Sequence, residues 1–539
     1  MRIISFSSVG IAQQLTLMHL FLFLCGLQRS FLPPTAAYIP VNPPPTSKPL
    51  QQTFLQRIDG LLTKFQNPEE QLKSHVYLTN NYAPVHDILV NQPVEVIEGA
   101  IPKDIDGMLC RNGPNPAFQT RLYHWFDGDA MLHNLRFQNG KAYYTNQYVP
   151  SISYELEQVL GEEFFHGLGE YTGIWGLFKT MIGAPIAEQF VGPYCGLVSS
   201  PPNTNCLMYQ NKFYCLNEGN VPFECKLLPD GRLEKVGYES FGGVLDYPIS
   251  AHPKVDENGD LLFHSYSVSA KVREGNGPIK VGRYSAETQR IENYFGPVPD
   301  QKHVSFAHDM MFTKDYMIIY DCSVHFDPKA MFDGGSYFRT NPNHNLRFGI
   351  MSKLDASKPE DVTWFDTGGK GGIVHPLNSW QEDDGTIVIW TPFCEHLVVD
   401  LESNDINKFE MVEFRLHPET GEMTRETIDD SVNIEFCVTP VSGRFVRYGY
   451  TAVQDVSAPG EGNFQGFCIW DMLERKLARK VLYDGMGGEP LLIESTSGKT
   501  YVGAYVQKEE TSYFDLFDGE TTERIMRLKM PGRVPYGFH

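Results

Sequence analysis

Short β-rich runs separated by turn sequences fill the chain from Val94 to its end, and this pattern constrains the fold more than any other feature. Turn sequences stand between alternating apolar runs at Gln138-Asn139-Gly140, Pro229-Asp230-Gly231, Glu257-Asn258-Gly259, Asp383-Asp384-Gly385 and Thr420-Gly421. Pairs such as Asn-Gly favour the tight turns of antiparallel hairpins. The pattern predicts an all-β fold. Because no clean internal repeat is visible, it leaves a sandwich, a barrel and a propeller open.

The composition limits the possible partners. The net charge of −21 argues against nucleic acid, because a protein that binds a phosphate backbone concentrates Lys and Arg, and no basic stripe is present. The ten cysteines stand singly, without a Cys-x-x-Cys pair. This spacing argues against structural zinc and favours free thiols in a reducing compartment.

The amino-terminal region differs in kind from the rest. Residues 1–37 combine the positive charge of Arg2 with an apolar stretch from Leu15 to Leu27, which is short for a membrane span. They predict a cleaved presequence of the signal-peptide type. The acid-free Ser/Thr/Pro stretch that follows Arg29 is similar to the bipartite presequences of algal plastids, so a plastid is the predicted location. Secretion, or an endomembrane location, is the alternative.

Two further segments precede the β-rich region. Residues 38–50 are rich in proline and predict a non-helical linker. Residues 51–84 predict a helical segment, because apolar residues from Phe54 to Phe65 recur on one stripe of a helix. This stripe either packs on the body of the protein or lies on a membrane surface.

Three short apolar segments each stop at a histidine, and a fourth histidine is the last residue of the sequence. These histidines close the runs Ile249-Ser250-Ala251-His252, Val304-Ser305-Phe306-Ala307-His308, Gly372-Ile373-Val374-His375 and Arg533-Val534-Pro535-Tyr536-Gly537-Phe538-His539. We expect each apolar segment to be the end of a strand, from which a side chain can point toward a common axis. Four neutral imidazoles at one point would suit a divalent transition metal and leave coordination positions open.

From about Val85 to His539 the sequence resembles the carotenoid cleavage oxygenases, a family of four-histidine non-haem iron enzymes. The matching motifs are Arg111-Asn112-Gly113-Pro114-Asn115-Pro116, His124-Trp125-Phe126-Asp127-Gly128-Asp129, Ala251-His252-Pro253-Lys254-Val255-Asp256, Ala307-His308-Asp309, Gly487-Gly488-Glu489-Pro490 and the closing Arg533 to His539. The resemblance implies a seven-bladed β-propeller over residues 85–539, with a metal on its axis and a dome of loops and helices above it.

The resemblance also assigns the site. It implies that the metal is Fe(2+), with O2 as co-substrate, and that the ligands are His252, His308, His375 and His539. Three glutamates match the family positions that fix the second N–H of metal-bound imidazoles, namely Glu218, Glu435 and Glu489. His417 lies in a hairpin sequence and is not expected to bind metal. Nor are His124 and His133, which fall in stretches that the family uses for packing.

One apolar stretch, from Ile174 to Ile186, interrupts the β pattern and carries Lys179 as its single charge. Exposed apolar patches usually mark contact surfaces, and in the family this region lies in the dome near a tunnel mouth that faces the membrane. The residues expected at this mouth are Ile174, Trp175, Leu177, Phe178, Met181 and Ile182. A helix buried in the core is the alternative.

The predicted function is an Fe(II)-dependent dioxygenase that cleaves a polyene double bond of a carotenoid or apocarotenoid to two carbonyl products, in peripheral contact with a membrane. Val432-Asn433-Ile434-Glu435 looks closer to the plant epoxycarotenoid-cleaving branch. Two alternatives are enzymes of the same family, a stilbene-cleaving dioxygenase and a retinoid or apocarotenoid isomerase. A third is a non-catalytic propeller that serves as a binding module. A fourth is a zinc hydrolase, which normally shows three ligands and a carboxylate base.

Overall fold

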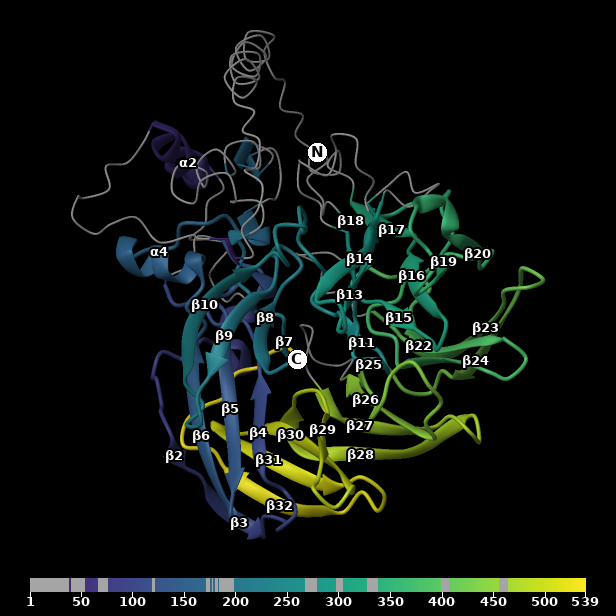
Figure 1. The fold of residues 1–539 in the computed structure, drawn as a ribbon. Helices are drawn as coiled ribbons and strands as arrows, with labels where there is room; N and C mark the ends of the chain where they lie inside the picture. Colours follow the sequence, from purple (N-terminus) through teal and green to yellow (C-terminus); the bar gives the residue numbers. More distant parts are fainter. Residues whose placement is uncertain are drawn as a thin grey trace, which may run out of the picture.

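The computed structural model describes residues 38–39, 54–65, 76–118, 122–170, 175–176, 178–179, 183, 198–266, 279–296, 304–326, 338–398, 407–454 and 464–539. The predicted presequence, residues 1–37, lies outside these ranges. Within them, the strands form seven antiparallel blades arranged around a centre, and the carboxyl-terminal residue lies at that centre (Figure 1). The fold is therefore all-β, as predicted.

Each blade is a meander of neighbouring strands, and the first three blades come from the first half of the described propeller. The first contains β4 (Gly107–Arg111), β5 (Met131–Gln138), β6 (Lys141–Tyr148) and β2 (Gln92–Pro93). The second contains β7 (Asn205–Tyr209), β8 (Lys212–Leu216), β9 (Phe223–Leu227), β10 (Leu233–Glu239) and β1 (Tyr38–Ile39). The third contains β11 (Lys254–Val255), β12 (Leu261–Ser265), β13 (Lys280–Ser285) and β14 (Arg290–Phe295).

The other four blades follow in chain order. The fourth contains β15 (Met311–Phe312), β16 (Tyr316–Asp321), β19 (Arg347–Ser352) and β20 (Thr363–Asp366), beside the hairpin β17 (Val324–Phe326) and β18 (Phe338–Thr340). The fifth contains β21 (Asn378–Gln381), β22 (Ile387–Phe393), β23 (Glu410–His417) and β24 (Glu422–Asp429). The sixth contains β25 (Ile434–Val438), β26 (Tyr448–Gln454), β27 (Phe464–Asp471) and β28 (Lys476–Gly487). The seventh contains β29 (Leu491–Glu494), β30 (Thr500–Lys508), β31 (Thr511–Asp518), β32 (Arg524–Lys529) and β3 (Glu95–Gly99).

Two short strands from the start of the propeller sequence join the first blade to the last. β2 pairs with β6 in the first blade, whereas β3 pairs with β32 in the seventh. In this second pairing Glu95 lies opposite Lys529, and Arg524 contacts Glu98 at 2.7 Å. The ring is closed by hydrogen bonds between segments from opposite ends of the propeller sequence.

The hairpins form at the predicted turn sequences. All five stand between paired strands of one blade, from β5–β6 to β23–β24. At the first of them, Asn139 and Gly140 have φ angles of 52° and 69°, which Asn and Gly adopt at low cost.

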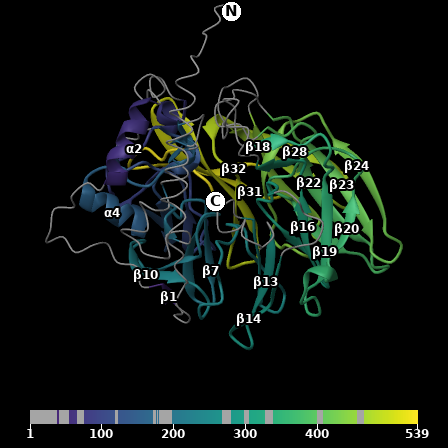
Figure 2. The same cartoon turned by 90° about the horizontal axis from the view of Figure 1, so that it is seen from above.

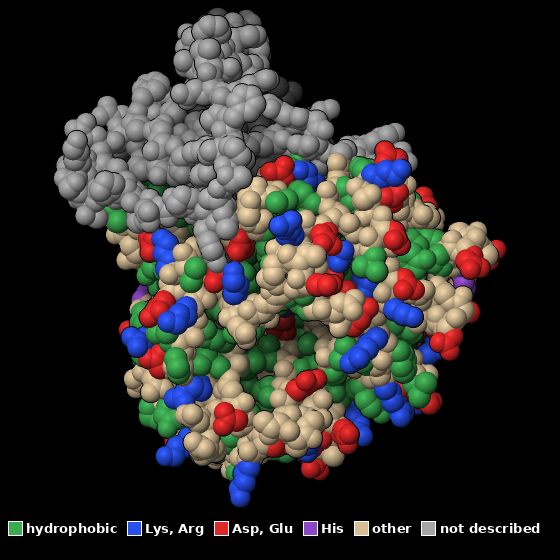
Figure 3. Space-filling model, viewed as in Figure 1, with side chains coloured by type: hydrophobic (Ala, Val, Ile, Leu, Met, Phe, Trp, Pro, Cys, Tyr) green, Lys and Arg blue, Asp and Glu red, His purple; other side chains and the backbone are tan. Residues whose placement is uncertain are grey.

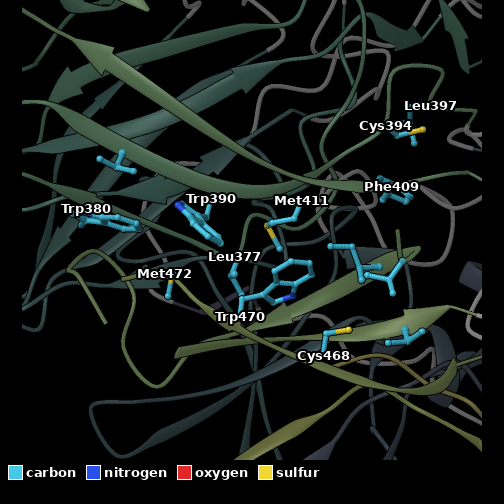
Figure 4. Close-up of a cluster of buried hydrophobic side chains, with 14 of the residues drawn as sticks. Leu377, Trp380, Trp390, Cys394, Leu397, Phe409, Met411, Cys468, Trp470 and Met472 are labelled. Atoms are coloured by element: carbon cyan, nitrogen blue, oxygen red, sulfur yellow. The ribbon is translucent and has the colours of Figure 1, made fainter. Parts of the chain in front are cut away.

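Neighbouring blades pack face to face through large apolar side chains. Between the fifth and sixth blades, Trp390 of β22 and Trp470 of β27 are completely buried in one cluster with Met411 (Figure 4). Each indole N–H has a partner, because Trp390 donates to Glu413 at 2.7 Å and Trp470 donates to Thr451 at 3.0 Å. Burying an apolar side chain of this size contributes about 1.5–3 kcal/mol, so these contacts hold the blades in a fixed arrangement.

The helices lie outside the blades. They are α2 (Phe54–Phe65), α4 (Ile152–Leu160) and the 3-10 turns η1 (Val76–Leu78), η2 (Asn80–Tyr82), η3 (Trp125–Asp127), η4 (Leu168–Glu170) and η8 (Pro359–Asp361). Helix α2 has the predicted bounds, and α2 and α4 lie side by side in both views (Figures 1 and 2). None of the helices in the described ranges is long and apolar enough to cross a bilayer.

Charged side chains of both signs are mixed over the face of the molecule drawn in Figure 3, without a basic stripe. The eight cysteines within the described ranges are free thiols. Four of them, Cys110, Cys206, Cys215 and Cys225, pack in or against one apolar cluster of the first three blades.

Candidate metal centre

Three of the predicted histidines enter the centre at the same place in successive blades. His252, His308 and His375 lie just before β11, β15 and β21, the first strands of the third, fourth and fifth blades. We expected the apolar segments before them to be strand ends. This detail is wrong, because these segments are mostly loops that lead into the next strand. Isolated bridges at Ser305 and Gly372 and backbone hydrogen bonds of Ile249 and Ser250 fix them.

His539 completes the group from the end of the chain. Its Nε2 atom lies 3.1 Å from Nε2 of His375, which is 3.0 Å from Nε2 of His308, and that atom is 2.9 Å from Nε2 of His252. One ligand atom from each of the four rings lies within 4.8 Å of all the others. The structure therefore brings together the four histidines that the sequence predicts.

Carboxylates face the opposite nitrogen of three of these rings. Nδ1 lies 2.8 Å from Glu218 in His308, 2.5 Å from Glu435 in His375 and 2.8 Å from Glu489 in His539. When these carboxyl groups are ionised they only accept hydrogen bonds, so each of these Nδ1 atoms then carries the proton and donates it. In a neutral ring the Nε2 atom is then left with a lone pair directed at the centre.

This donor set fits a metal ion. Ring nitrogens lie 2.9–3.1 Å from one another, and where both carry lone pairs they repel, so that a cation between them converts the repulsion into binding. A metal–nitrogen bond of about 2.1 Å places neighbouring nitrogens about 3.0 Å apart in an octahedron and about 3.4 Å apart in a tetrahedron. The three separations of 2.9–3.1 Å are shorter than those expected for a tetrahedral zinc site, and four imidazole ligands would leave coordination positions open on a metal that takes more than four.

Burial favours the neutral, metal-binding form of two of the rings. It lowers the pKa of His252 and His375 well below the ordinary value of an imidazole. Burial alone would lower the pKa of His539 too, but the neighbouring Glu489 carboxylate outweighs it and raises that pKa. Burial raises the pKa of Glu435 to about 7, and the charge of a bound dication would favour the ionised form of this carboxyl group.

A bulge in β25 places Glu435 under His375. The pairing with β26 shifts between Glu435 and Cys437, and the intervening Phe436 has a φ of 52°, which is unusual for a bulky residue. The Glu435 carboxylate accepts from the backbone N–H of Phe436 and, at 3.2 Å, from that of His375. The centre of the Phe436 ring lies 4.9 Å from that of the His375 ring. Glu435 therefore holds the His375 imidazole by a hydrogen bond, and the next residue, Phe436, covers it.

The fourth ring, that of His252, is held differently. Its Nδ1 lies 4.0 Å from Asp309, and among the described residues no carboxylate approaches it more closely. Asp309 is engaged by Lys254 at 2.7 Å and accepts from the backbone N–H of Met310 at 2.6 Å. His252 therefore lacks the direct carboxylate partner that the other three rings have.

His264 is a buried residue that the sequence analysis did not single out. It shares a 2.6 Å hydrogen bond with the backbone oxygen of Ala307, the residue before His308, through its Nε2. Burial lowers the pKa of His264 to about 4, so the ring is neutral and Nε2–H is the donor. No motif marks this role, because the partner is a backbone atom in another segment.

The histidines that we did not expect to bind metal lie elsewhere. His417 contacts Thr386 at 3.1 Å in the β23–β24 hairpin region, and His133 contacts Tyr144 at 2.7 Å within the first blade. His124 caps η3 by accepting from the backbone N–H of Phe126. None of these residues belongs to the four-histidine group.

Only part of the predicted membrane patch falls within the described residues. Ile174, Leu177, Met181 and Ile182 lie outside them. Trp175 and Phe178 are partly buried and pack against a cluster that contains Leu62 of α2 and Leu156 of α4. Lys179, the single charge of the stretch, is completely buried in an ion pair with Glu170. These described residues face the protein, whereas Leu61 of α2 is 54% exposed.

Comparison with known proteins adds a sequence relationship. The family described as retinal pigment epithelial membrane protein matches residues 82–539. The probable carotenoid cleavage dioxygenase 4, chloroplastic, of Arabidopsis thaliana is 28% identical over 93% of this chain and 87% of its own length. The carotenoid 9,10(9',10')-cleavage dioxygenase 1 of the same plant is 27% identical over 94% of this chain and 96% of its own length.

Solved structures share the fold. The lignostilbene dioxygenase of Pseudomonas brassicacearum superposes with a TM-score of 0.71 at 19% identity, over 86% of this chain and 98% of that one. The cobalt-substituted apocarotenoid oxygenase of Synechocystis superposes with a TM-score of 0.69 at 21% identity, over 88% of this chain and 98% of that one. The predicted propeller is confirmed.

Proposed function

Because the chain belongs to the retinal pigment epithelial membrane protein family, the carotenoid cleavage oxygenases, we propose that it is an Fe(II)-dependent dioxygenase that cleaves a polyene double bond of a carotenoid or apocarotenoid. The chain is an enzyme of this family. The observation that carries the proposal is the convergence of four imidazole nitrogens, from three rings whose other nitrogen faces a carboxylate and from His252.

In this proposal His252, His308, His375 and His539 hold the metal, and Glu218, Glu435 and Glu489 fix the ligand rings. Bound iron supplies the one-electron chemistry that lets dioxygen react with an alkene. The two oxygen atoms of O2 end as the carbonyl oxygens of the two products, so the overall reaction needs no external reductant and no general base. The work of the protein is ligand geometry, exclusion of water and placement of the substrate.

Aromatic side chains beside the ligands support an apolar substrate. The ring of Phe306 is parallel to that of His308 at 5.8 Å, and Phe436 lies over His375 and within 5.4 Å of His539. Rings in these positions exclude water from the imidazoles and offer an apolar surface to a polyene. A zinc hydrolase would instead need a carboxylate free to act as base, whereas all three glutamates here are engaged with ligands.

The relatives support a carotenoid substrate. Among them are carotenoid 9,10(9',10')-cleavage dioxygenases and a chloroplastic 9-cis-epoxycarotenoid dioxygenase of Arabidopsis thaliana, the latter 29% identical over 86% of this chain and 81% of its own length. We therefore propose a C40 carotenoid or a shorter apocarotenoid, cut near the 9,10 or 11,12 position. The alternatives within the family are cleavage of a stilbene and isomerisation of a retinoid or apocarotenoid.

Product masses test the proposal directly. Purified, iron-loaded protein is incubated with β-carotene, an epoxyxanthophyll, an apocarotenal and a hydroxystilbene while oxygen uptake is recorded. We expect oxygen consumption and two carbonyl-terminated fragments from a carotenoid or apocarotenoid, and neither with His308→Ala. Cleavage of the stilbene alone would assign the other substrate class. Isomerised or hydrolysed product without oxygen uptake would refute a dioxygenase, and absence of any turnover with bound iron would favour the non-catalytic module.

The location proposed for the protein is the plastid. Residues 1–37 act as presequence, residues 38–50 as linker, residues 51–84 as a helical segment and residues 85–539 as the propeller domain. The word "chloroplastic" in the names of several relatives supports a plastid. A fluorescent protein fused behind residues 1–50 should accumulate in the plastids of an algal host, and accumulation in the secretory pathway would support the secreted or endomembrane alternative.

Peripheral contact with a membrane is proposed because polyenes dissolve in bilayers rather than in water. The described part of the Ile174–Ile186 stretch packs inward, so the exposed edge of α2 is the better candidate for the contact. Leu61 lies on this edge, while Leu62 and Asp59 face the protein. Asp59 is fixed there by His166, whose Nε2 lies 2.7 Å from its carboxylate.

A further inference from the structure

Two motifs near the start of the propeller sequence take no part in the proposed chemistry. They are Arg111-Asn112-Gly113-Pro114-Asn115-Pro116 and His124-Trp125-Phe126-Asp127-Gly128-Asp129. Both lie against residues 530–539, which we call the carboxyl-terminal arm and which follow β32 without forming a strand. The arm carries His539 into the centre.

The four ligands reach the centre on different segments. His252, His308 and His375 each lie within three residues of a strand that is paired inside a blade. Residues 530–539 belong to no strand, and contacts with other parts of the chain fix their position. Its backbone hydrogen bonds show where these contacts come from.

The first motif binds the arm through its backbone. Asn112 donates its N–H to the oxygen of His539 at 2.8 Å and accepts from the N–H of Phe538 at 2.9 Å. Gly113 fits closely, because a Cβ atom at this position would lie 2.8 Å from Cα of Gly537. The arm therefore lies backbone to backbone on the first motif.

Arg111 secures the same contact from the side. Its guanidinium donates to the backbone oxygen of Pro535 at 2.8 Å, and its Cζ lies 4.9 Å from the ring centre of Tyr505 in β30. Arg111 is only 3% exposed. A planar guanidinium can stack on an aromatic ring and donate hydrogen bonds in its own plane at the same time, which a lysine cannot do.

The second motif packs on the aromatic side chains of the arm. The ring of Trp125 lies 4.5 Å from that of Phe538, the residue next to His539, and Phe126 lies 5.6 Å from the same ring. Tyr82 packs against Tyr536 at 4.9 Å. Phe538 is thus held by rings on one side while its backbone is held by Asn112.

We propose that Arg111 is a positioning residue for His539: it fixes the arm, and through the arm it sets the affinity of the centre for metal. This inference rests on the proposed function, because it takes the four histidines as ligands. It also gives the two motifs a role, since they hold the arm that carries His539. Arg111 acts through His539 and does not touch the centre.

The first test removes the hydrogen bond of Arg111 and keeps its bulk. Arg111→Met should lower the affinity for Co(II) by roughly 10–100-fold, the usual effect of losing a group that orients a ligand. The absorption spectrum of the Co(II) that still binds should differ from that of the parent, because the geometry at His539 changes. Arg136→Met is the control. Like Arg111, Arg136 stacks on a tyrosine, with its Cζ 4.4 Å from the ring centre of Tyr143, but it does not touch the arm.

A second, independent variant guards against misfolding of the first. Gly113→Ala adds one methyl group where the backbone of Gly537 leaves no room, so the arm must move and Co(II) affinity should fall. Gly369→Ala is its control, because a Cβ there would meet no atom within 4 Å. Near-ultraviolet circular dichroism and the thermal midpoint of each metal-free protein show whether the blades are intact.

Parent-like Co(II) affinity and spectrum in both folded variants would overturn the inference, as would an equal loss in the control variants. His308→Ala separates this failure from failure of the proposed function. If His308→Ala keeps full metal binding, the four-histidine centre itself is wrong. If it loses metal while Arg111→Met and Gly113→Ala do not, only the role of Arg111 is refuted.

Discussion

Replacing Glu435 by glutamine tests how a carboxylate tunes the centre without contacting the metal. Glu435 accepts three N–H groups, from His375 Nδ1 at 2.5 Å, from the backbone of His375 at 3.2 Å and from the backbone of Phe436. A glutamine amide has one oxygen. In Glu435→Gln an NH2 group must therefore face one of these donors.

The size of the effect follows from these contacts. A buried donor left without its acceptor costs about 1–3 kcal/mol, and the protein can relieve this cost by rotating the His375 ring away from its position. Every 1.4 kcal/mol corresponds to about tenfold in an equilibrium constant. We expect the free energy of unfolding to fall by about 1–3 kcal/mol and metal affinity to fall roughly 10–100-fold.

The assay is competition between the protein and a chelator for Co(II) or Fe(II), with urea unfolding of the metal-free protein measured in parallel. Glu413→Gln is the control. Glu413 is also buried, at 2% exposed, and accepts hydrogen bonds from Trp390 and Arg475, neither of which is a proposed metal ligand. It should lose stability but keep metal affinity. Unchanged metal affinity in folded Glu435→Gln, and equally in the same changes at Glu218 and Glu489, would show that these carboxylates do not orient the ligands.

Other predictions follow from the same structure. Changing any of the four central histidines to alanine, for example His308→Ala, should abolish bound iron or turnover, whereas His417→Ala should leave iron content and turnover intact. Iron analysis by mass spectrometry measures the iron content of each variant, and full iron content in His308→Ala would contradict the prediction. Removing the metal with a chelator should lower the thermal midpoint, since a ligand at 100 times its Kd stabilises the folded state by about 2.7 kcal/mol. An unchanged midpoint would mean that metal does not bind the folded state selectively. Leu61→Asp should reduce flotation of the protein with liposomes. Leu354→Asp should not reduce it, because Leu354 is 60% exposed on the fourth blade, away from α2. Equal flotation of the two variants would exclude the edge of α2 as the membrane contact.

Local patterns predicted the elements of this fold well. The Asn139-Gly140 turn and the helix from Phe54 to Phe65 depend on residues close in sequence, and both form where expected. The choice of a propeller, and of the four histidines among sixteen, came from resemblance to a family. Spacing alone left several all-β folds open.

Contacts between distant segments could not be predicted. The hydrogen bond from Arg111 to Pro535 and the packing of Trp125 on Phe538 each join residues from opposite ends of the propeller sequence. The role of His264 was missed for a similar reason, because its partner is a backbone oxygen. The apolar stretch around Trp175 was expected to face a membrane because its sequence shows a single charge. In the structure that charge, Lys179, is buried with Glu170.

The pairing of β3 with β32 has a consequence for how the chain folds. During synthesis β3 leaves the ribosome long before β32, so β3 has no partner until almost the entire propeller sequence has emerged. Contacts between segments that are so distant in sequence form slowly, and a strand that stays unpaired during this time promotes aggregation. All five residues of β3 are exposed in the finished ring, and Glu95 and Glu98 place negative charge on this strand. That charge would discourage pairing with a second nascent chain until β32 arrives.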